Sequence, residues 1–250
     1  MKLNELEKYR VIDSNTYFGF YPGRGVDSSL ERLLRLMKNY RISRSITLSL
    51  RGIFYDFVAG NEETLKICSS RRELIPAAVI DPRRYINCFD EIDKRVSQGF
   101  KLFRFFPNFQ RWPIEYITFY EILKRINEYG VPVMISIPNP GDTTKLYTAI
   151  KELDLPIILS GLNDAYIFFS ELLTVCKLKE NLYVETHCFT TPDAYELFVR
   201  EVGPDKIIYG SGSPLTYIGS SLNSLMNSDV SERDKKLILR ENILKLIKLS

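Results

Sequence analysis

The stretch GFKLFRFFPNFQRWPIEYITFYEILKRINEYGVPVMISI, residues 99–137, decides the fold because it holds one complete strand–helix–strand unit. Two short apolar runs, 100–106 and 131–137, flank a longer amphipathic stretch, 114–130, which ends in Gly130. Short apolar runs are typical of buried strands, and an amphipathic stretch closed by glycine is typical of a helix. The segment therefore predicts two buried strands joined by a helix that packs on them.

The same alternation continues from one end of the chain to the other, with no polar linker or low-complexity break. The predicted strands are 9–15, 44–50, 74–81, 100–106, 131–137, 155–161, 181–187 and 206–212. The predicted helices are 28–40, 61–72, 85–98, 114–130, 142–153, 165–179, 192–202 and 231–248. Eight such units in 250 residues predict an α/β fold, a single-domain (β/α)8 TIM barrel over residues 1–250. The alternative is a doubly wound open sheet, but the loop NTYFGFYPGRG (15–25) lacks the glycine spacing of a dinucleotide site.

Composition excludes several classes of function. The 34 basic and 31 acidic residues are spread along the chain and give a net charge of only +3, which argues against a nucleic-acid partner. The N-terminus is charged, and no apolar run approaches the roughly 18 residues of a membrane span, so we expect a cytoplasmic protein without a membrane partner. The four cysteines form no C-x-x-C pair, and the chain has one histidine, so neither a zinc knuckle nor a multi-histidine metal site is expected.

In a barrel of this kind the site is built where the strands end, so the candidate residues can be read directly. They are Asn15, Tyr17, Arg51, Tyr55, Arg104, Ser136, Asn139, Ser160, Asn163, Glu185, His187, Ser211 and Gly212. This polar set is poor in carboxylates and has arginines as its charged members, which favours a small anionic ligand over a metal cation. The alternative for Arg51 and Arg104 is a structural ion pair inside the barrel, for which Asp13 is a candidate partner.

The chain also resembles a known family in the framing of these strand ends. VIDSNTYFG (11–19) resembles the first-strand D-x-H-x-H-x-G motif of the amidohydrolase superfamily. VGPDKIIYGSGSP (202–214) is similar to V-G-x-D-R-I-L-Y-G-S-D-Y-P of its amidohydrolase-related branch, which includes decarboxylases of the aminocarboxymuconate semialdehyde type. Four further segments match in the family's order: GNEETLKI (60–67), AAVIDPRR (77–84), QGFKLFRFFPNFQRWPI (98–114) and INEYGVPVMIS (126–136).

The resemblance implies the fold, but this sequence departs from the family pattern at the positions of the family's metal ligands. The family's two first-strand histidines fall on Asn15 and Tyr17, its fifth- and sixth-strand histidines on Ser136 and Ser160, and its eighth-strand aspartate on Gly212. Amide, phenol and hydroxyl oxygens are poor zinc ligands, so we expect no metal and no other cofactor. The resemblance also implies a homodimer, since dimers are common among relatives.

Two functions remain open. The first is a metal-independent hydrolase, lactonase or decarboxylase that acts on a small carboxylate-bearing substrate. It would use His187 or Tyr17 for proton transfer and Arg104 or Arg51 to stabilise an oxyanion. Asn15, Arg51, Tyr55, Ser136, Asn139, Ser160, Asn163 and Ser211 would then bind the substrate. The second function is a catalytically inactive barrel, a pseudoenzyme that keeps the pocket and binds a small anionic ligand or a protein partner.

Overall fold

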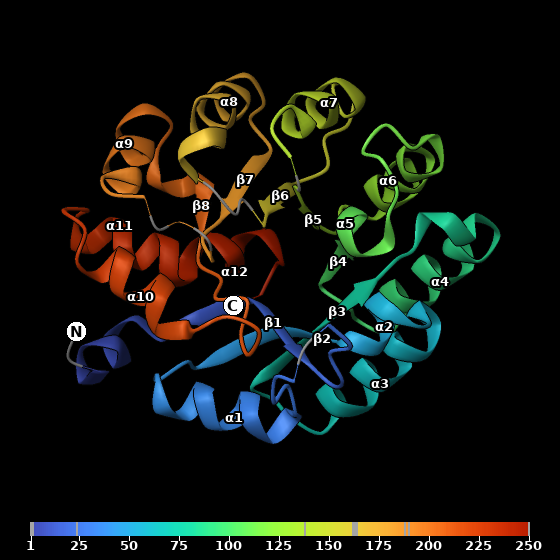
Figure 1. Ribbon diagram of the computed structural model, residues 1–250, viewed down its shortest axis with the longest axis horizontal. Coiled ribbons are helices and arrows are strands. Elements are labelled where there is room, and N and C mark those ends of the chain that lie inside the picture. Colours follow the sequence, from blue (N-terminus) through green and yellow to red (C-terminus); the bar gives the residue numbers. More distant parts are fainter. Residues whose placement is uncertain are drawn as a thin grey trace.

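Eight parallel strands lie side by side in chain order and curve into a barrel (Figure 1). The strands are β1 Ile12–Phe18, β2 Arg44–Ser49, β3 Leu74–Val79, β4 Leu102–Phe105, β5 Val133–Ser136, β6 Ile157–Ser160, β7 Leu182–Glu185 and β8 Ile207–Ile208. This computed structural model describes residues 3–23, 25–137, 139–161, 165–187, 189 and 191–249. The predicted (β/α)8 barrel is confirmed.

The segment after β8 closes the barrel against β1. Backbone hydrogen bonds join Ser14 N to the Tyr209 carbonyl at 3.1 Å, Gly212 N to the Asn15 carbonyl at 2.8 Å and Tyr17 N to the Ser213 carbonyl at 2.9 Å. These bonds pair the last strand segment with the first, so the sheet is not the open, doubly wound alternative. They also place the chain around Gly212 directly beside Asn15.

Helices form an outer layer around the strands (Figure 1). They are α1 Leu30–Asn39, α2 Leu50–Phe54, α3 Phe57–Ser69, α4 Tyr85–Ser97, α5 Pro107–Gln110, α6 Ile117–Tyr129, α7 Asp142–Ala149, α8 Ala165–Leu178, α9 Ala194–Glu201, α10 Ile218–Met226, α11 Glu232–Lys236 and α12 Asn242–Leu246. Shorter segments are the 3-10 helices η1 Leu3–Tyr9, η2 Pro82–Arg84 and η3 Pro204–Lys206, and the π-helical turn η4 Leu237–Glu241. Their buried apolar side chains pack against the strands in one continuous core.

The elements differ from the predictions in several places. Strand β1 begins three residues later than predicted because η1 runs to Tyr9 and Arg10 adopts a left-handed φ of 49°. Asn15 and Tyr17 therefore lie inside β1. Helices α2, α5 and α10 were not predicted, and the single predicted helix 231–248 is divided into α11, η4 and α12.

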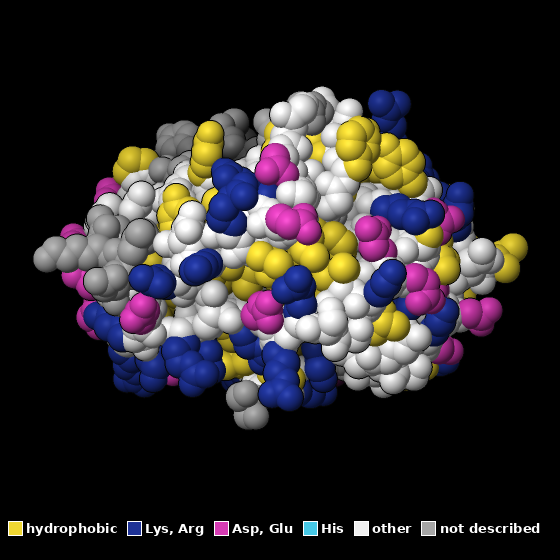
Figure 2. Space-filling view, turned by 90° about the horizontal axis from the view of Figure 1, so that it is seen from below, with side chains coloured by type: hydrophobic (Ala, Val, Ile, Leu, Met, Phe, Trp, Pro, Cys, Tyr) yellow, Lys and Arg dark blue, Asp and Glu magenta, His cyan; other side chains and the backbone are white. Residues whose placement is uncertain are grey.

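The charged and the hydrophobic side chains are unevenly distributed over the surface. In Figure 2 Lys and Arg side chains gather along the lower edge, mainly at its left. Hydrophobic side chains gather instead at the upper right edge. Within the described residues, no helix combines the length and apolar character that crossing a membrane requires.

The contact between α2 and α3 leaves no room for a side chain on Gly60. A Cβ atom built there would lie 2.2 Å from the backbone nitrogen of Gly52 and 2.4 Å from its Cα. We expect Gly60→Ala to lower the free energy of unfolding, measured by urea denaturation, by about 1–3 kcal/mol, because backbone must move to relieve the clash. Gly25→Ala is the matched control, since nothing lies within 4 Å of its Cβ position. Equal stability of the two variants would contradict this account of the α2–α3 contact.

Candidate functional site

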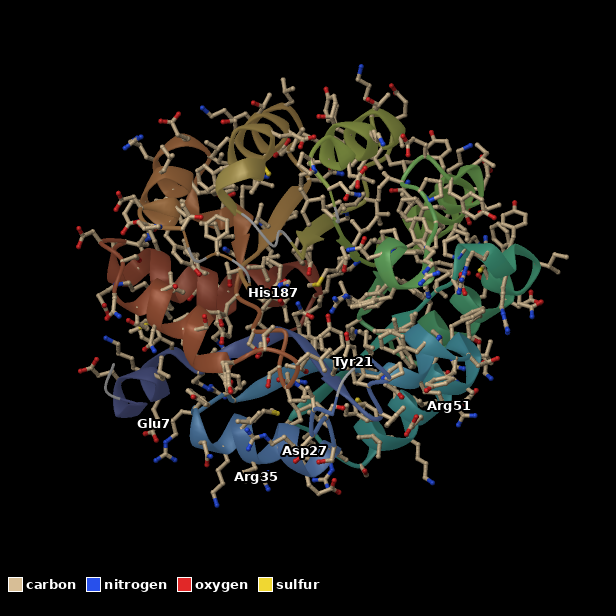
Figure 3. The ribbon with its side chains drawn as sticks, in the orientation of Figure 1. Glu7, Tyr21, Asp27, Arg35, Arg51 and His187 are labelled. Atoms are coloured by element: carbon tan, nitrogen blue, oxygen red, sulfur yellow. The ribbon has the colours of Figure 1, made fainter. Side chains whose placement is uncertain are left out.

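A pocket of about 240 Å³ opens at the carboxyl ends of the strands. The residues that line it include Tyr17, Ser136, Ser160, His187, Gly212 and Phe109. Figure 3 shows His187 near the centre of the barrel and Tyr21, another lining residue, farther toward β2. The pocket therefore gathers residues from strands far apart in the sequence, as the barrel predicts.

Glu185, at the end of β7, is a buried carboxylate that accepts several hydrogen bonds. Its Oε2 atom accepts hydrogen bonds from Asn15 Nδ2 at 2.9 Å, Ser160 Oγ at 2.8 Å and His187 Nδ1 at 2.7 Å, and Oε1 accepts the His187 backbone N–H at 2.7 Å. Burial by itself would raise the pKa of this carboxyl, but the His187 charge and these hydrogen bonds outweigh burial and lower its pKa. The ionised Glu185 thus fixes a proton on His187 Nδ1, so that proton transfer to a ligand runs through Nε2.

Arg104, from β4, is buried with only neutral partners. Its Nη1 donates to Asn15 Oδ1 at 3.0 Å and its Nη2 to Tyr17 Oη at 3.1 Å, whereas its buried Nε has no hydrogen-bond partner. The guanidinium carbon also lies 4.9 Å from the ring centroid of Phe106. Within the described residues Arg104 makes no ion pair with a carboxylate, so the structural pairing with Asp13 is wrong. A positive charge therefore lies directly beneath the Tyr17 hydroxyl.

Asp13 lies deeper in the barrel, on β1. It accepts hydrogen bonds from the backbone N–H groups of Asn15 (3.1 Å) and Ser211 (2.9 Å) and from the Ser211 hydroxyl (2.5 Å). Burial is the main reason that its pKa is raised to about 7, since the hydrogen bonds offset only part of the desolvation. Near neutral pH this carboxyl is therefore partly protonated.

Two glycines after β8 make room for the Glu185–His187 pair. A Cβ on Gly210 would lie 2.2 Å from Glu185 Oε1. A Cβ on Gly212, whose φ is +69°, would lie 2.6 Å from Thr216 Oγ1 and 3.1 Å from His187 Cδ2. The end of the eighth strand therefore contributes space and backbone to the site.

The structure separates the other candidate residues. Arg51 and Tyr55 line a neighbouring pocket with Ser49 and Glu63, and Figure 3 shows Arg51 well away from His187. Asn139 is exposed, and its side chain donates to Asp142 at 3.0 Å, at the start of α7. The buried Ser211 contacts Asp13, so it lies below the pocket. Asn163 is outside the described residues.

The sequence did not single out three features of the pocket: the Glu185–Asn15–Arg104 chain of hydrogen bonds, and the wall residues Tyr21 and Phe109. Tyr21, Phe109 and Phe54 contact one another edge to face, with ring centroids 5.1–6.5 Å apart. The signal available in the sequence was the concentration of aromatic residues in the loops after the first and fourth strands. Across the described part of the chain, no group of three or more His, Cys, Asp and Glu side chains is placed to hold a metal ion.

Comparison with known proteins adds a family and a set of structural relatives. Residues 57–249 match the family model described as amidohydrolase. No curated protein matches this chain.

Among solved structures, the chain is similar to 2,6-dihydroxybenzoate decarboxylase in complex with 2,6-dihydroxybenzoate (16% identity, 96% of this chain and 99% of that chain, TM-score 0.77). It is also similar to 5-carboxyvanillate decarboxylase from Sphingomonas paucimobilis (11% identity, 97% and 100%, TM-score 0.75). A third similar structure is a probable 2-pyrone-4,6-dicarboxylic acid hydrolase from Acinetobacter baumannii with citric acid bound (14% identity, 96% and 100%, TM-score 0.73). At these identities the likeness establishes the fold.

The raised pKa of Asp13 predicts how stability depends on pH. Between the ordinary aspartate value of 3.8 and the folded value of about 7, the unfolded chain is ionised here while the folded protein stays protonated. The contribution of Asp13 to stability is therefore full below about pH 4 and falls as pH rises to about 7. Across this window we expect the unfolding free energy of the parent, relative to D13N, to fall by up to about 4 kcal/mol.

Urea denaturation of the parent and D13N at several pH values measures this difference. An asparagine keeps an oxygen that can accept the Ser211 backbone N–H, and its Nδ2 can donate to the Ser211 hydroxyl oxygen. D90N, which removes an exposed carboxylate on α4, is the control for the loss of one charge. The effect of Glu185 on stability has the opposite sign, because its pKa is lowered from 4.5. Its contribution is present above about pH 4.5 and is lost as the pH falls below that value. Parallel curves for the parent and D13N would refute the assignment.

Proposed function

The chain belongs to the amidohydrolase family, and from this premise we propose that it hydrolyses a small carboxylate-bearing ester or lactone without a metal ion. The observation that carries the proposal is the arrangement around one pocket. His187, oriented by Glu185 at 2.7 Å, and Tyr17, which accepts a hydrogen bond from Arg104 at 3.1 Å, both line it. A base with a fixed tautomer and a polarised hydroxyl donor are the two groups that acyl transfer to water needs.

The residues at the family's metal positions do not fit a divalent metal ion. Asn15 and Tyr17 offer neutral oxygens, and both oxygens already accept hydrogen bonds from the Arg104 guanidinium, at 3.0 and 3.1 Å. A cation bound there would lie next to that buried positive charge, and its repulsion would add to the weakness of these ligands. Gly212 has no side chain to contribute. The proposed reaction therefore uses no metal-bound water.

In the proposed reaction, His187 Nε2 takes a proton from a water molecule while the water oxygen bonds to the acyl carbon. The carbonyl oxygen becomes an oxyanion and accepts a hydrogen bond from the Tyr17 hydroxyl, which the Arg104 guanidinium makes a stronger donor. Glu185 stabilises the imidazolium that forms. The acyl–oxygen bond then breaks, and the imidazolium returns its proton to the departing alkoxide, giving an acid and an alcohol, or a hydroxy acid from a lactone.

Two observations support the proposed substrate class: the charge of Arg104 and the names of the structurally similar proteins. Arg104 leaves an uncompensated positive charge beneath the pocket, which favours a substrate that carries a carboxylate. The structurally similar proteins include decarboxylases named for benzoate-type acids and a probable hydrolase of a dicarboxylic acid. These relatives support a carboxylate substrate, and the pair of His187 and Tyr17 supports hydrolysis.

The H187Q variant tests the proposal. On a panel of small carboxylate-bearing lactones and esters followed by acid release at constant pH, we expect the parent to turn over at least one compound. H187Q should lose about 10²–10⁴-fold in kcat with little change in KM, because it removes the base. Dialysis of the parent against a chelator should leave kcat unchanged. A rate that depends on added zinc or manganese would refute the metal-free reaction, and binding without any turnover would favour the pseudoenzyme.

The Y17F variant tests the oxyanion donor separately. It removes one hydroxyl and keeps the ring that packs near Phe106, so we expect kcat to fall by about 10²-fold or more. The free energy of unfolding should also fall, by about 1–3 kcal/mol, because Arg104 Nη2 loses its acceptor. Y85F, on the exposed face of α4, is the matched control and should retain parent kinetics. A Y17F enzyme with unchanged kcat would remove Tyr17 from the mechanism.

A further inference from the structure

Three arginines meet at the N-terminal end of the barrel, opposite the pocket. Arg10 precedes β1, Arg44 is the first residue of β2, and Arg240 lies in η4. The Arg240 guanidinium donates from Nη1 to the Arg10 carbonyl at 3.0 Å. The Val11 carbonyl accepts the backbone N–H of Arg44 at 3.4 Å, so the chain segments that carry the three residues are in direct contact. We call Arg10, Arg44 and Arg240 the arginine cluster.

The arginine cluster has no carboxylate partner within the described residues, although carboxylates lie near it in the sequence or at the start of the neighbouring strand β3. Glu241 pairs with Lys236 at 3.0 Å, Glu7 with Arg41 at 3.3 Å and Glu73 with Arg71 at 3.6 Å. Each of these acidic side chains is therefore engaged by a different cation.

The charges of the cluster oppose one another. Burial, followed by the positive charges of Arg10 and Arg44, lowers the pKa of Arg240, and the attraction of Glu241 offsets only part of this. The Nε atom of Arg44 is buried and has no hydrogen-bond partner. Three arginines on contacting segments, none of them paired with a carboxylate within the described residues, leave positive charge and N–H donors that an oxyanion can satisfy.

We propose that the arginine cluster is a binding site for a multivalent oxyanion of the phosphate class, carried either by inorganic phosphate or by a small phosphate monoester. A guanidinium group binds two oxygens of a phosphate in a planar, bidentate geometry. A phosphate has enough oxygens to bind more than one arginine, whereas a single carboxylate can bind only one arginine in this way. The site is separate from the pocket at the carboxyl ends of the strands and goes beyond the proposed hydrolysis.

Thermal melting of the parent and of charge variants tests the site. At constant ionic strength, replacing sodium chloride by about 10 mM inorganic phosphate should raise the Tm of the parent by roughly 3–6 °C. R44Q and R240Q should lose most of this shift. R233Q, which removes an exposed arginine on α11, is the matched control and should keep it. In dilute chloride buffer R240Q should melt no lower than R233Q, because it relieves repulsion within the cluster.

Two further arms locate the ligand and identify its source. H187Q should keep the full phosphate shift, since its pocket is at the other end of the barrel. A larger shift with glycerol phosphate than with inorganic phosphate at equal concentration assigns a phosphate monoester, and an equal shift assigns the free ion. The proposal is overturned if phosphate stabilises R44Q, R240Q and R233Q alike, if chloride matches phosphate in the parent, or if the shift disappears in H187Q.

Discussion

The site depends on how two opposite buried charges are accommodated. Glu185 on β7 and Arg104 on β4 are connected through Asn15, whose amide donates to the carboxylate at 2.9 Å and accepts from the guanidinium at 3.0 Å. A buried charge is tolerated only when hydrogen bonds replace its hydration. Glu185 accepts several such hydrogen bonds, one of them from His187. Arg104 donates only to the neutral oxygens of Asn15 and Tyr17, so its positive charge is not balanced by a carboxylate on the side of Tyr17. The anion preference that we propose follows from that asymmetry.

The sequence predicted the barrel because a fold of this kind is specified redundantly. Eight repeated units have to agree, and an error of a few residues in one unit, such as the start of β1, leaves the architecture intact. Parallel strands also bring their carboxyl ends to one side, so the meeting of Tyr17, Ser136, Ser160 and His187 at one pocket followed from the strand order alone.

The partners of individual side chains could not be predicted in the same way. Arg51 directly follows β2 in the sequence, so it was expected at the pocket together with Tyr17 of β1. Ser49 caps helix α2 at that point, however, and Arg51 lies on α2 and lines a separate pocket. Arg104 could pair with Asp13 or with Asn15, and the choice depends on the stagger of β1 against β4 and on the Ser211 hydroxyl and backbone N–H, which occupy Asp13. Which partner a side chain contacts depends on differences of a few ångströms in position, and these cannot be predicted from a pattern of residue types.

Gly212, the position on which the resemblance in sequence places an aspartate of the family, has a physical reason in this chain. An aspartate at 212 would place its Cβ against Thr216 Oγ1 and the His187 ring, and it would add a negative charge next to a pair that already contains Glu185. His187 and a side chain at position 212 therefore compete for the same space. In the same way, Gly210 is required by the Glu185 carboxylate, since a Cβ there would overlap Oε1. The glycines and the Glu185–His187 pair thus depend on each other, because a side chain at position 210 or 212 would displace the carboxylate or the imidazole ring.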